Sequence, residues 1–160
     1  MIEIFCRSTE ETQQLAQALG RVLRGNEAIE LVSDVGGGKT TFVKGLAKGL
    51  DINEVVQSPT FTISRLYNAR DGLELHHFDF YRLNEAGVVA AELAESLAQT
   101  NAIVAVEWGD IVHDVLPKDH ITLQIKNIGE HERRLVFTIP ASFEYIAEAL
   151  SYYKEQRAMA

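Results

Sequence analysis

The sequence has only one cysteine and no long apolar run. Cys6 has no second cysteine with which to form a disulfide within the chain, and its place in a predicted strand favours a buried, inert thiol over a nucleophile. No apolar segment approaches the roughly 20 residues that span a bilayer, and the N-terminus lacks the basic and apolar regions of a secretory signal. We therefore expect a cytoplasmic protein with no membrane partner.

Basic residues are also in the minority. The chain has 15 lysines and arginines against 23 aspartates and glutamates, which gives a formal net charge of −8. Because affinity for nucleic acid comes mostly from cations that neutralise phosphates, this balance argues against broad binding of RNA or DNA. A protein partner, or a nucleotide held in a local cationic site, suits the composition better. At 160 residues, we expect one domain over residues 1–160.

The stretch from Ala28 to Leu50 has the pattern of a strand, a glycine-rich turn and an amphipathic helix. The turn contains three successive glycines: Gly36, Gly37 and Gly38. Their backbone freedom allows several N–H groups to point at one anion. Lys39 adds a mobile cation, and Thr40 places a hydroxyl at the helix start, where a magnesium ion beside the β- and γ-phosphates would sit. The stretch therefore predicts a phosphate-binding loop.

This loop departs from the strict pattern G-x-x-x-x-G-K-[ST] at its first position, where the chain has Ser33. An ordinary strand-to-helix turn with surplus glycine is the alternative interpretation. The apolar strand before the loop and the apolar helical stripe after it favour the phosphate site. Ser33 adds a Cβ where the strand ends. If this Cβ shifts the loop, the affinity for nucleotide changes.

The remaining elements alternate before they turn into hairpins. Strands are expected at Ile2–Phe5, Ala28–Val32 and Ile103–Val106, hairpins at Phe61–Tyr67 with Leu73–Tyr81 and at Ile121–Ile125 with Leu135–Ile139, and helices after Ser8, within Glu85–Gln99 and from Phe143 to about Gln156. This order predicts an α/β fold with a mostly parallel, helix-covered sheet and antiparallel hairpin additions. A phosphate site then belongs at the carboxyl ends of the parallel strands.

Two patterns predict details of the helices. Ser8 followed by Glu11 is the pattern of a capping box, so a helix is expected to begin there. Gly45 and Gly49 share one face of the helix after the glycine loop, where each costs about 1 kcal/mol relative to alanine. We expect this face to pack closely against the sheet.

Glu107 directly follows the apolar strand Ile103–Val106. Its carboxylate is therefore expected at the same sheet edge as the glycine loop, where it can hold magnesium directly or through water. A solvated strand-end glutamate is the alternative. Trp108, the next residue, lies beside this expected metal site or is simply a large core residue.

The segment from His76 to Arg82 is the third candidate. A strand period of two puts His77, Asp79 and Tyr81 on one face, while Phe78 and Phe80 on the opposite face look like core. Asp79 could orient or deprotonate an attacking water, or help to hold the water shell of a metal ion. The alternative is a solvated histidine and acid with no catalytic role.

The motifs SDVGGGKTTF, SPTF, HFDFYRL and VEWGD, in this order and at these intervals, resemble those of the TsaE family, small bacterial P-loop ATPases of tRNA threonylcarbamoyladenosine synthesis. The likeness runs from Thr12 to about Arg134. It implies a three-layer P-loop NTPase fold, ATP bound with Mg²⁺, and weak ATPase activity. The implied partner is a sugar-kinase-like heterodimer that transfers threonylcarbamoyl to tRNA adenosine. The chain would reset that complex by hydrolysing ATP and would meet tRNA only indirectly.

The resemblance also implies roles for individual residues. The metal ligands map onto Thr40 and Glu107, and the catalytic positions map onto Asp79, Lys39, Ser58 and Thr60, of which Ser58 and Thr60 belong to a switch-like segment, 58–61. The nucleotide-binding positions map onto Thr12, Val35, Gly36, Gly37, Gly38, Lys39, Thr40, Thr41 and Arg133. Thr12 and one arginine of the last hairpin, here taken as Arg133, resemble positions on the base side of the nucleotide.

The family's loop usually has glycine where this chain has Ser33, alanine at Gly37 and leucine at Val35. Two other functions stay open beside the ATPase. A small-molecule kinase on this fold usually carries an arginine-bearing lid, and residues 84–100 contain no arginine or lysine, which counts against it. A module that binds nucleotide without hydrolysing it is favoured if Ser33 has altered the loop.

Overall fold

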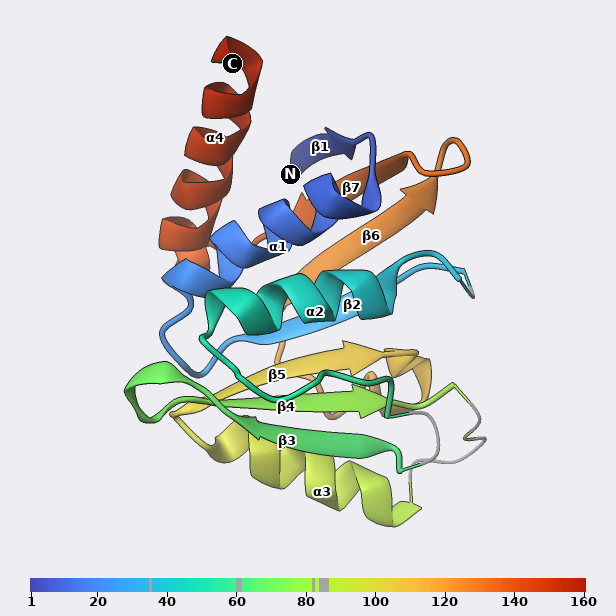
Figure 1. Ribbon diagram of the computed structural model, residues 1–160. Coiled ribbons are helices and arrows are strands. Elements are labelled where there is room, and N and C mark those ends of the chain that lie inside the picture. Colours follow the sequence, from blue (N-terminus) through green and yellow to red (C-terminus); the bar gives the residue numbers. More distant parts are fainter. Residues whose placement is uncertain (35, 60–61, 82, 84–86) are drawn as a thin grey trace.

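The computed structural model describes residues 1–34, 36–59, 62–81, 83 and 87–160. The strands of this part are β1 (Ile2–Cys6), β2 (Ala28–Val32), β3 (Ser64–Asn68), β4 (Glu74–Asp79), β5 (Ala102–Glu107), β6 (Ile121–Asn127) and β7 (Arg133–Thr138). Its α-helices are α1 (Thr9–Val22), α2 (Lys39–Gly49), α3 (Gly87–Ala98) and α4 (Glu144–Met159) (Figure 1). Within these ranges, no helix is both long enough and apolar enough to cross a membrane.

The strands form one sheet in the order β1-β7-β6-β2-β5-β4-β3. The four central strands, β6, β2, β5 and β4, are mutually parallel. The antiparallel pairs lie at the two sides, where β3 joins β4 and where β7 joins both β6 and β1. The prediction of a parallel sheet with two added hairpins is therefore confirmed.

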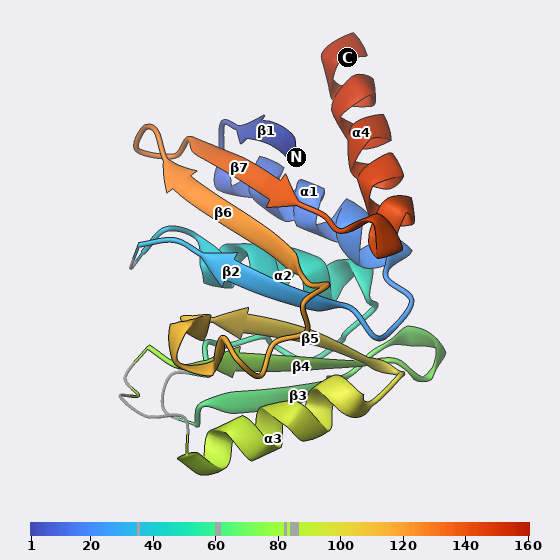
Figure 2. The same ribbon diagram turned by 180° about the vertical axis from the view of Figure 1, so that it is seen from behind.

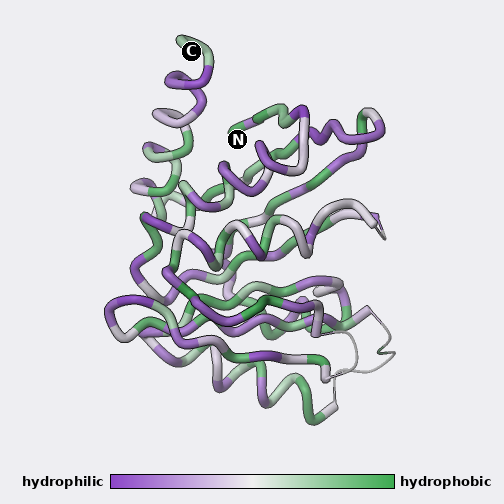
Figure 3. Tube along the Cα trace, viewed as in Figure 1, coloured by the Kyte–Doolittle hydropathy of each residue, from purple (hydrophilic) through white to green (hydrophobic). Residues whose placement is uncertain are grey.

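Helices cover both faces of the sheet, which makes three layers (Figures 1 and 2). On β5, Ile103 and Ala105 belong to the core beneath α1 and α2, whereas Val104 and Val106 belong to the core beneath α3. Such a strand is buried on both sides, as expected for the middle of a parallel sheet. Figure 3 shows hydrophobic stretches along the strands in the middle of the sheet. The C-terminal helix α4 packs on the side of α1 through its first half, where Ile146 and Leu150 are buried.

The same alternation divides β4. Leu75 packs into the core beneath α1 and α2, and Phe78 and Phe80 pack into the core beneath α3. The predicted core role of the two phenylalanines is confirmed. His77 and Asp79 consequently lie on the face that carries α2.

Helix α1 begins as predicted but is capped differently from a full capping box. The hydroxyl of Ser8 accepts a hydrogen bond from the backbone N–H of Glu11 at 3.1 Å, as an N-cap should. The Glu11 carboxylate, however, accepts from the backbone N–H of Arg7 at 2.7 Å instead of from that of Ser8. The N-cap is confirmed. The second bond of the capping box is wrong by one residue, because its donor is the N–H of Arg7 and not that of Ser8.

The expected contact of Gly45 and Gly49 with the sheet is wrong. A Cβ on Gly45 would lie 2.5 Å from the carbonyl oxygen of Gln13, and one on Gly49 would lie 2.8 Å from the Cα of Gly20. Both neighbours belong to α1. The larger side chains of α2 meet the sheet, as the ring contact of Phe42 with Phe137 of β7 illustrates. The glycines therefore allow two helices to touch, and their cost in helix propensity is offset by that close packing.

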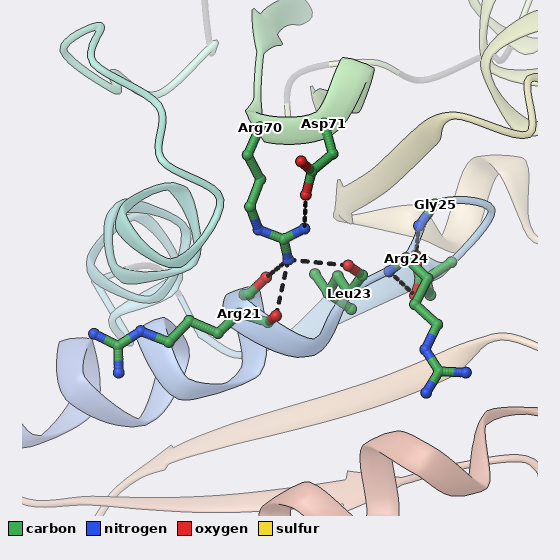
Figure 4. A network of polar contacts seen from close by, with 8 residues as sticks. Arg21, Leu23, Arg24, Gly25, Arg70 and Asp71 are labelled. Carbon is green, nitrogen blue, oxygen red and sulfur yellow. Dashed lines mark hydrogen bonds and ion pairs between the residues drawn. The ribbon is translucent and has the colours of Figure 1, made fainter.

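One arginine ties the β3–β4 turn to the end of α1 (Figure 4). The Nη2 atom of Arg70 donates hydrogen bonds to the carbonyl oxygens of Gly20 and Arg21 at 2.9 Å and of Leu23 at 3.0 Å. These carbonyls end a helix and have no partners within it. The contact lies at the amino end of the parallel strands.

Candidate functional site

A cavity of about 380 Å³ lies at the carboxyl ends of β2, β4 and β5. Its lining comes from the glycine loop, the first turn of α2, and the segments around the ends of β4 and β5: Gly36, Gly37, Gly38, Lys39, Thr40, Thr41, Ser58, Asp79, Tyr81, Glu107 and Trp108. Most of the residues that the sequence singles out thus meet in one place. Val35 and Thr60 lie outside the described residues.

The register of the parallel strands explains this meeting. Glu107 is opposite Asp79 of β4 on one side and Leu31 of β2 on the other. Strands β4 and β5 therefore end level with each other, and β2 ends one residue later, where its chain passes into the glycine loop. Three segments far apart in sequence converge because their strands point the same way.

The glycine loop uses backbone conformations that favour glycine at two positions. Gly36 has φ 76° and Gly38, the N-cap of α2, has φ 103°. The loop is closed by a hydrogen bond from the N–H of Gly37 to the carbonyl of Asp34 at 2.9 Å. The loop thus leads directly into the N-terminus of α2, where free N–H groups and the helix dipole favour an anion.

Ser33 and Gly37 fit one another. A Cβ on Gly37 would lie 2.7 Å from the Cβ of Ser33 and closer still to its hydroxyl oxygen, so the serine occupies the space that a larger residue 37 needs. The Ser33 hydroxyl donates to the carbonyl of Asp34 at 3.0 Å. The serine at the first motif position is accommodated by the absence of a side chain at Gly37.

Lys39 is held inside the cavity. Its Nζ donates to the carbonyl of Ser33 at 3.2 Å and lies 4.3 Å from the centroid of the Trp108 ring. Burial lowers the pKa of Lys39, and the nearby carboxylates of Glu107 and Asp79 oppose that shift. The cation therefore lies between the loop and two acids, where a phosphate could reach it.

Asp79 is 6% exposed and fixed by bonds to both of its oxygens. Its Oδ1 accepts from the backbone N–H of Tyr81 at 3.0 Å, and the hydroxyl of Ser58 donates to its Oδ2 at 3.4 Å. The predicted switch-like segment thus reaches the predicted catalytic acid through Ser58. The arrangement holds a carboxylate at the cavity wall in a defined orientation.

Glu107 is 3% exposed and bonded to a residue for which the sequence suggested no role. The Nε2 atom of His77 lies 2.5 Å from Oε2 of Glu107, and His77 itself is fully buried. Within the described part of the chain, Nδ1 of His77 is a buried atom without a hydrogen-bond partner. The one signal in the sequence was that His77 shares a strand face with Asp79.

The donor atoms fit a magnesium ion that arrives with phosphates. Thr40 and Glu107 line the same cavity and offer a hydroxyl and a carboxylate. The described residues contain no cluster of three or more histidines, cysteines or acids that could form a complete metal site. Mg²⁺ bound with nucleotide needs no such cluster, because waters and phosphate oxygens fill most of its six positions.

Trp108 belongs to the cavity wall. It follows β5 with φ 58°, and its ring centroid lies 5.0 Å from that of Tyr81. It is half-buried, packs against the core beneath α3 and also lines the cavity. The interpretation of Trp108 as a core residue is therefore confirmed in part, and its place beside a metal site stays a prediction.

Thr12 and Arg133 lie on the other side of the glycine loop, in a small cavity of about 20 Å³ that Gly38 and Thr41 also line. The Thr12 hydroxyl donates to the carbonyl of Ser8 at 3.3 Å. The Nε of Arg133 would lie 3.7 Å from a Cβ on Gly38, whereas Arg134 pairs with Glu3. Of the two arginines in this hairpin, Arg133 is the one beside the loop.

Comparison with known proteins agrees with these motifs and this fold. A sequence model of the family described as "Threonylcarbamoyl adenosine biosynthesis protein TsaE" matches residues 6–135. The chain is 36% identical over 145 residues to the tRNA threonylcarbamoyladenosine biosynthesis protein TsaE of Bacillus subtilis, covering 89% of each. It is 37% identical over 135 residues to the protein of that name from Aquifex aeolicus, covering 83% of this chain and 92% of the relative.

The crystal structure of Bacillus subtilis YdiB shares the fold, with a TM-score of 0.79, 32% sequence identity and coverage of 95% of both chains. The predicted three-layer P-loop NTPase fold is confirmed by this neighbour together with the layers and sheet order described above. The family match covers most of the sequence, including all four motifs that suggested it. The chain belongs to the TsaE family.

Proposed function

We propose that the protein binds ATP with Mg²⁺ in the cavity and hydrolyses it slowly, in support of the threonylcarbamoyl modification of tRNA adenosine. Family membership and the names of the relatives support the role in tRNA threonylcarbamoyladenosine biosynthesis. One observation carries the ATPase: the glycine loop with Lys39 and Thr40 lines the same cavity as the buried acids Asp79 and Glu107.

The loop would bind the phosphates. Backbone N–H groups of Gly36, of Gly38 and of the first turn of α2 would supply donors and a partial positive charge, while the N–H of Gly37 closes the loop on Asp34. Lys39, already within the cavity, adds a full positive charge that can bond phosphate oxygens. Thr12 and Arg133 would contact the nucleotide on its base side and Thr41 would also contact the nucleotide, which is supported by their place next to Gly38.

Thr40 and Glu107 would hold the magnesium ion. When bound, Mg²⁺ neutralises charge that develops on the phosphates during transfer. The protein contributes a hydroxyl at the start of α2 and a carboxylate at the end of β5, two rigid elements that fix the distance between these groups.

Asp79 would orient the attacking water and accept its proton. Bonds from the Tyr81 N–H and from the Ser58 hydroxyl fix the carboxylate so that a water beside it is positioned rather than randomly oriented. Ser58 acts with Asp79 at this wall of the cavity. Thr60 belongs to the same segment, and its catalytic role remains a proposal from the sequence alone.

The hydrolysis would act on a partner, a sugar-kinase-like heterodimer that carries out the threonylcarbamoyl transfer in the cytoplasm. ATP turnover would reset that complex between rounds. The net charge of −8 supports an indirect relation to tRNA, because an acidic surface gains little from approaching a polyanion alone.

Phosphate release measured with and without the purified heterodimer tests this function. We expect slow release from the chain and none from Lys39→Ala. No release under either condition, with nucleotide still bound, would identify a binding module without hydrolysis. Transfer of phosphate to a small acceptor would identify a kinase instead.

A further inference from the structure

His77 is hydrogen-bonded to the proposed metal ligand Glu107 and lies farther from the cavity than that carboxylate. In the register of β4 and β5, Glu107 is opposite Asp79, and His77 precedes Asp79 by two residues on the same strand face. The imidazole therefore lies one layer deeper than the two acids and reaches Glu107 diagonally, at 2.5 Å between Nε2 and Oε2.

Among the described residues, the imidazole of His77 has one polar partner, Glu107. It shares its face with Leu75 of β4 and with Ile103 and Ala105 of β5, all of which belong to the apolar core. Its Nδ1 is buried and has no hydrogen-bond partner among the described residues. A buried polar atom without a partner costs about 1–3 kcal/mol, so an apolar residue would suit the core better at this position.

The bond has a definite direction when Glu107 is ionised, as a magnesium ligand is. A carboxylate oxygen then only accepts, so Nε2 carries the proton and donates it. This tautomer leaves Nδ1 as an acceptor and avoids a buried N–H donor with no partner. The bond engages Oε2, and the described residues make no hydrogen bond to Oε1.

We propose that His77 is a positioning residue for the magnesium site. Its Nε2–H holds Oε2 of Glu107, which fixes the carboxylate in the wall of the cavity that Thr40 also lines and leaves Oε1 as the oxygen for the metal ion. The inference rests on the proposed function, because Glu107 must be the ligand that His77 orients. Partners of this kind typically contribute ~10–100-fold to metal affinity.

Three substitutions of His77 separate the effect of its hydrogen-bond donor from the effect of its ring. Glutamine places its amide nitrogen three bonds from Cβ, as Nε2 of histidine is, and can donate to Glu107. Asparagine places its nitrogen one bond nearer to the backbone, where the unpartnered Nδ1 lies, and cannot reach Glu107. Leucine fills similar space without a donor and replaces asparagine if that variant does not fold.

The full-length chain is titrated with ATP over a range of Mg²⁺ concentrations, and Trp108, its only tryptophan and a residue of the cavity wall, reports binding by fluorescence. For His77→Asn and His77→Leu, we expect half-maximal binding to need ~10–100-fold more Mg²⁺. His77→Gln should stay within about threefold of the parent, and binding in excess EDTA should be equal in all of them, because the glycine loop is untouched.

His76→Asn is the matched control. His76 is the neighbouring buried histidine, and it bonds Ser96 at 2.7 Å and Glu74 at 3.0 Å away from the cavity. We expect this variant to melt at a lower temperature with an unchanged Mg²⁺ dependence. That result separates a positioning role from a loss of packing in β4.

Equal Mg²⁺ dependence of the parent and His77→Leu would overturn the inference, as would a His77→Gln variant as defective as His77→Asn. Equal losses with and without Mg²⁺ would also overturn it, since they indicate a structural role. If the parent itself binds ATP without any response to Mg²⁺, the proposed metal site fails, and the inference fails with it.

Discussion

The two ends of the parallel strands differ in how their buried charged groups are bonded. At the amino end, Glu27 is 1% exposed and its carboxylate accepts from the backbone N–H groups of Arg24 at 2.7 Å and Gly25 at 2.8 Å and from the Tyr145 hydroxyl. Nearby, Arg70 satisfies three carbonyls at the end of α1. Glu27 and Arg70 are therefore bonded to groups of the protein itself.

At the carboxyl end, the charged groups surround a cavity. Lys39 and Glu107 are buried and line this cavity, yet the side chain of each makes one hydrogen bond to the described residues. Desolvation without full compensation costs stability. The difference indicates that the amino end stabilises the fold, whereas the carboxyl end keeps charge available for a ligand.

The largest expected effect is at the carboxyl end. Replacing Lys39 with alanine removes the cavity's cation, and we expect ATP affinity to fall by about 100-fold or more, because a buried charge–phosphate bond is lost. Calorimetric titration with ATP and Mg²⁺ measures this. Thermal stability should fall little, because among the described residues the Lys39 side chain makes one hydrogen bond, to Ser33; a large loss of stability would mean that Lys39 is a structural residue.

Asp79 should separate hydrolysis from binding. Asp79→Asn keeps the shape of the side chain and removes the base, so we expect nucleotide affinity within about threefold of the parent and phosphate release lower by about 100-fold or more. A stopped assay of phosphate release in the presence of the partner heterodimer measures the rate. Turnover at the parental rate would show that Asp79 has no part in the chemistry.

Glu27 tests the other side of the comparison. Glu27→Ala leaves two backbone N–H groups and the Tyr145 hydroxyl without their acceptor, and we expect a loss of about 3 kcal/mol in the free energy of unfolding. Denaturant unfolding measures it. ATP affinity should not change, and Glu27→Gln, which keeps one acceptor oxygen, should lose less. If affinity falls while stability is retained, the division between the two ends is wrong.

The smallest effect expected is in the glycine loop. Gly37→Ala introduces a Cβ against Ser33, and we expect ATP affinity to fall about tenfold, or about 1.4 kcal/mol. Ser33→Gly together with Gly37→Ala should restore affinity to within about threefold of the parent, because the methyl group of Ala then occupies the space that the Ser33 side chain leaves. If the same titration shows that the double variant loses as much ATP affinity as the two single variants together, Ser33 and Gly37 do not fit one another in this way.

Much of the fold was predictable because its signals are local. The apolar strands, the hairpin turns and the N-cap at Ser8 each lie within a few residues, and all were found. The facing partner of Gly45 and Gly49 was predicted wrongly, because helical spacing identifies a close-packed face without telling which element it meets. The bonds of Arg70 to α1 have no sequence signal, since they join segments about 50 residues apart.

The site was predictable for a different reason. Asp79 and Glu107 end β4 and β5, the glycine loop follows β2, and parallel strands bring their ends to one edge. The bond between His77 and Glu107 depends on the register of β4 against β5, which no local pattern contains. The pairing of Ser33 with Gly37 likewise depends on the path of the loop and not on the spacing of its motif.

A crystal structure grown with Mg²⁺ and a non-hydrolysable ATP analogue would show whether the cavity binds ATP and its metal ion. We expect phosphate density in the curve of residues 36–38, Nζ of Lys39 bonded to phosphate oxygens, and a magnesium ion held by Thr40 and Glu107. Asp79 should lie beside the γ-phosphate. Nucleotide density outside this cavity, or a metal ion without Thr40 and Glu107 as ligands, would contradict this expectation.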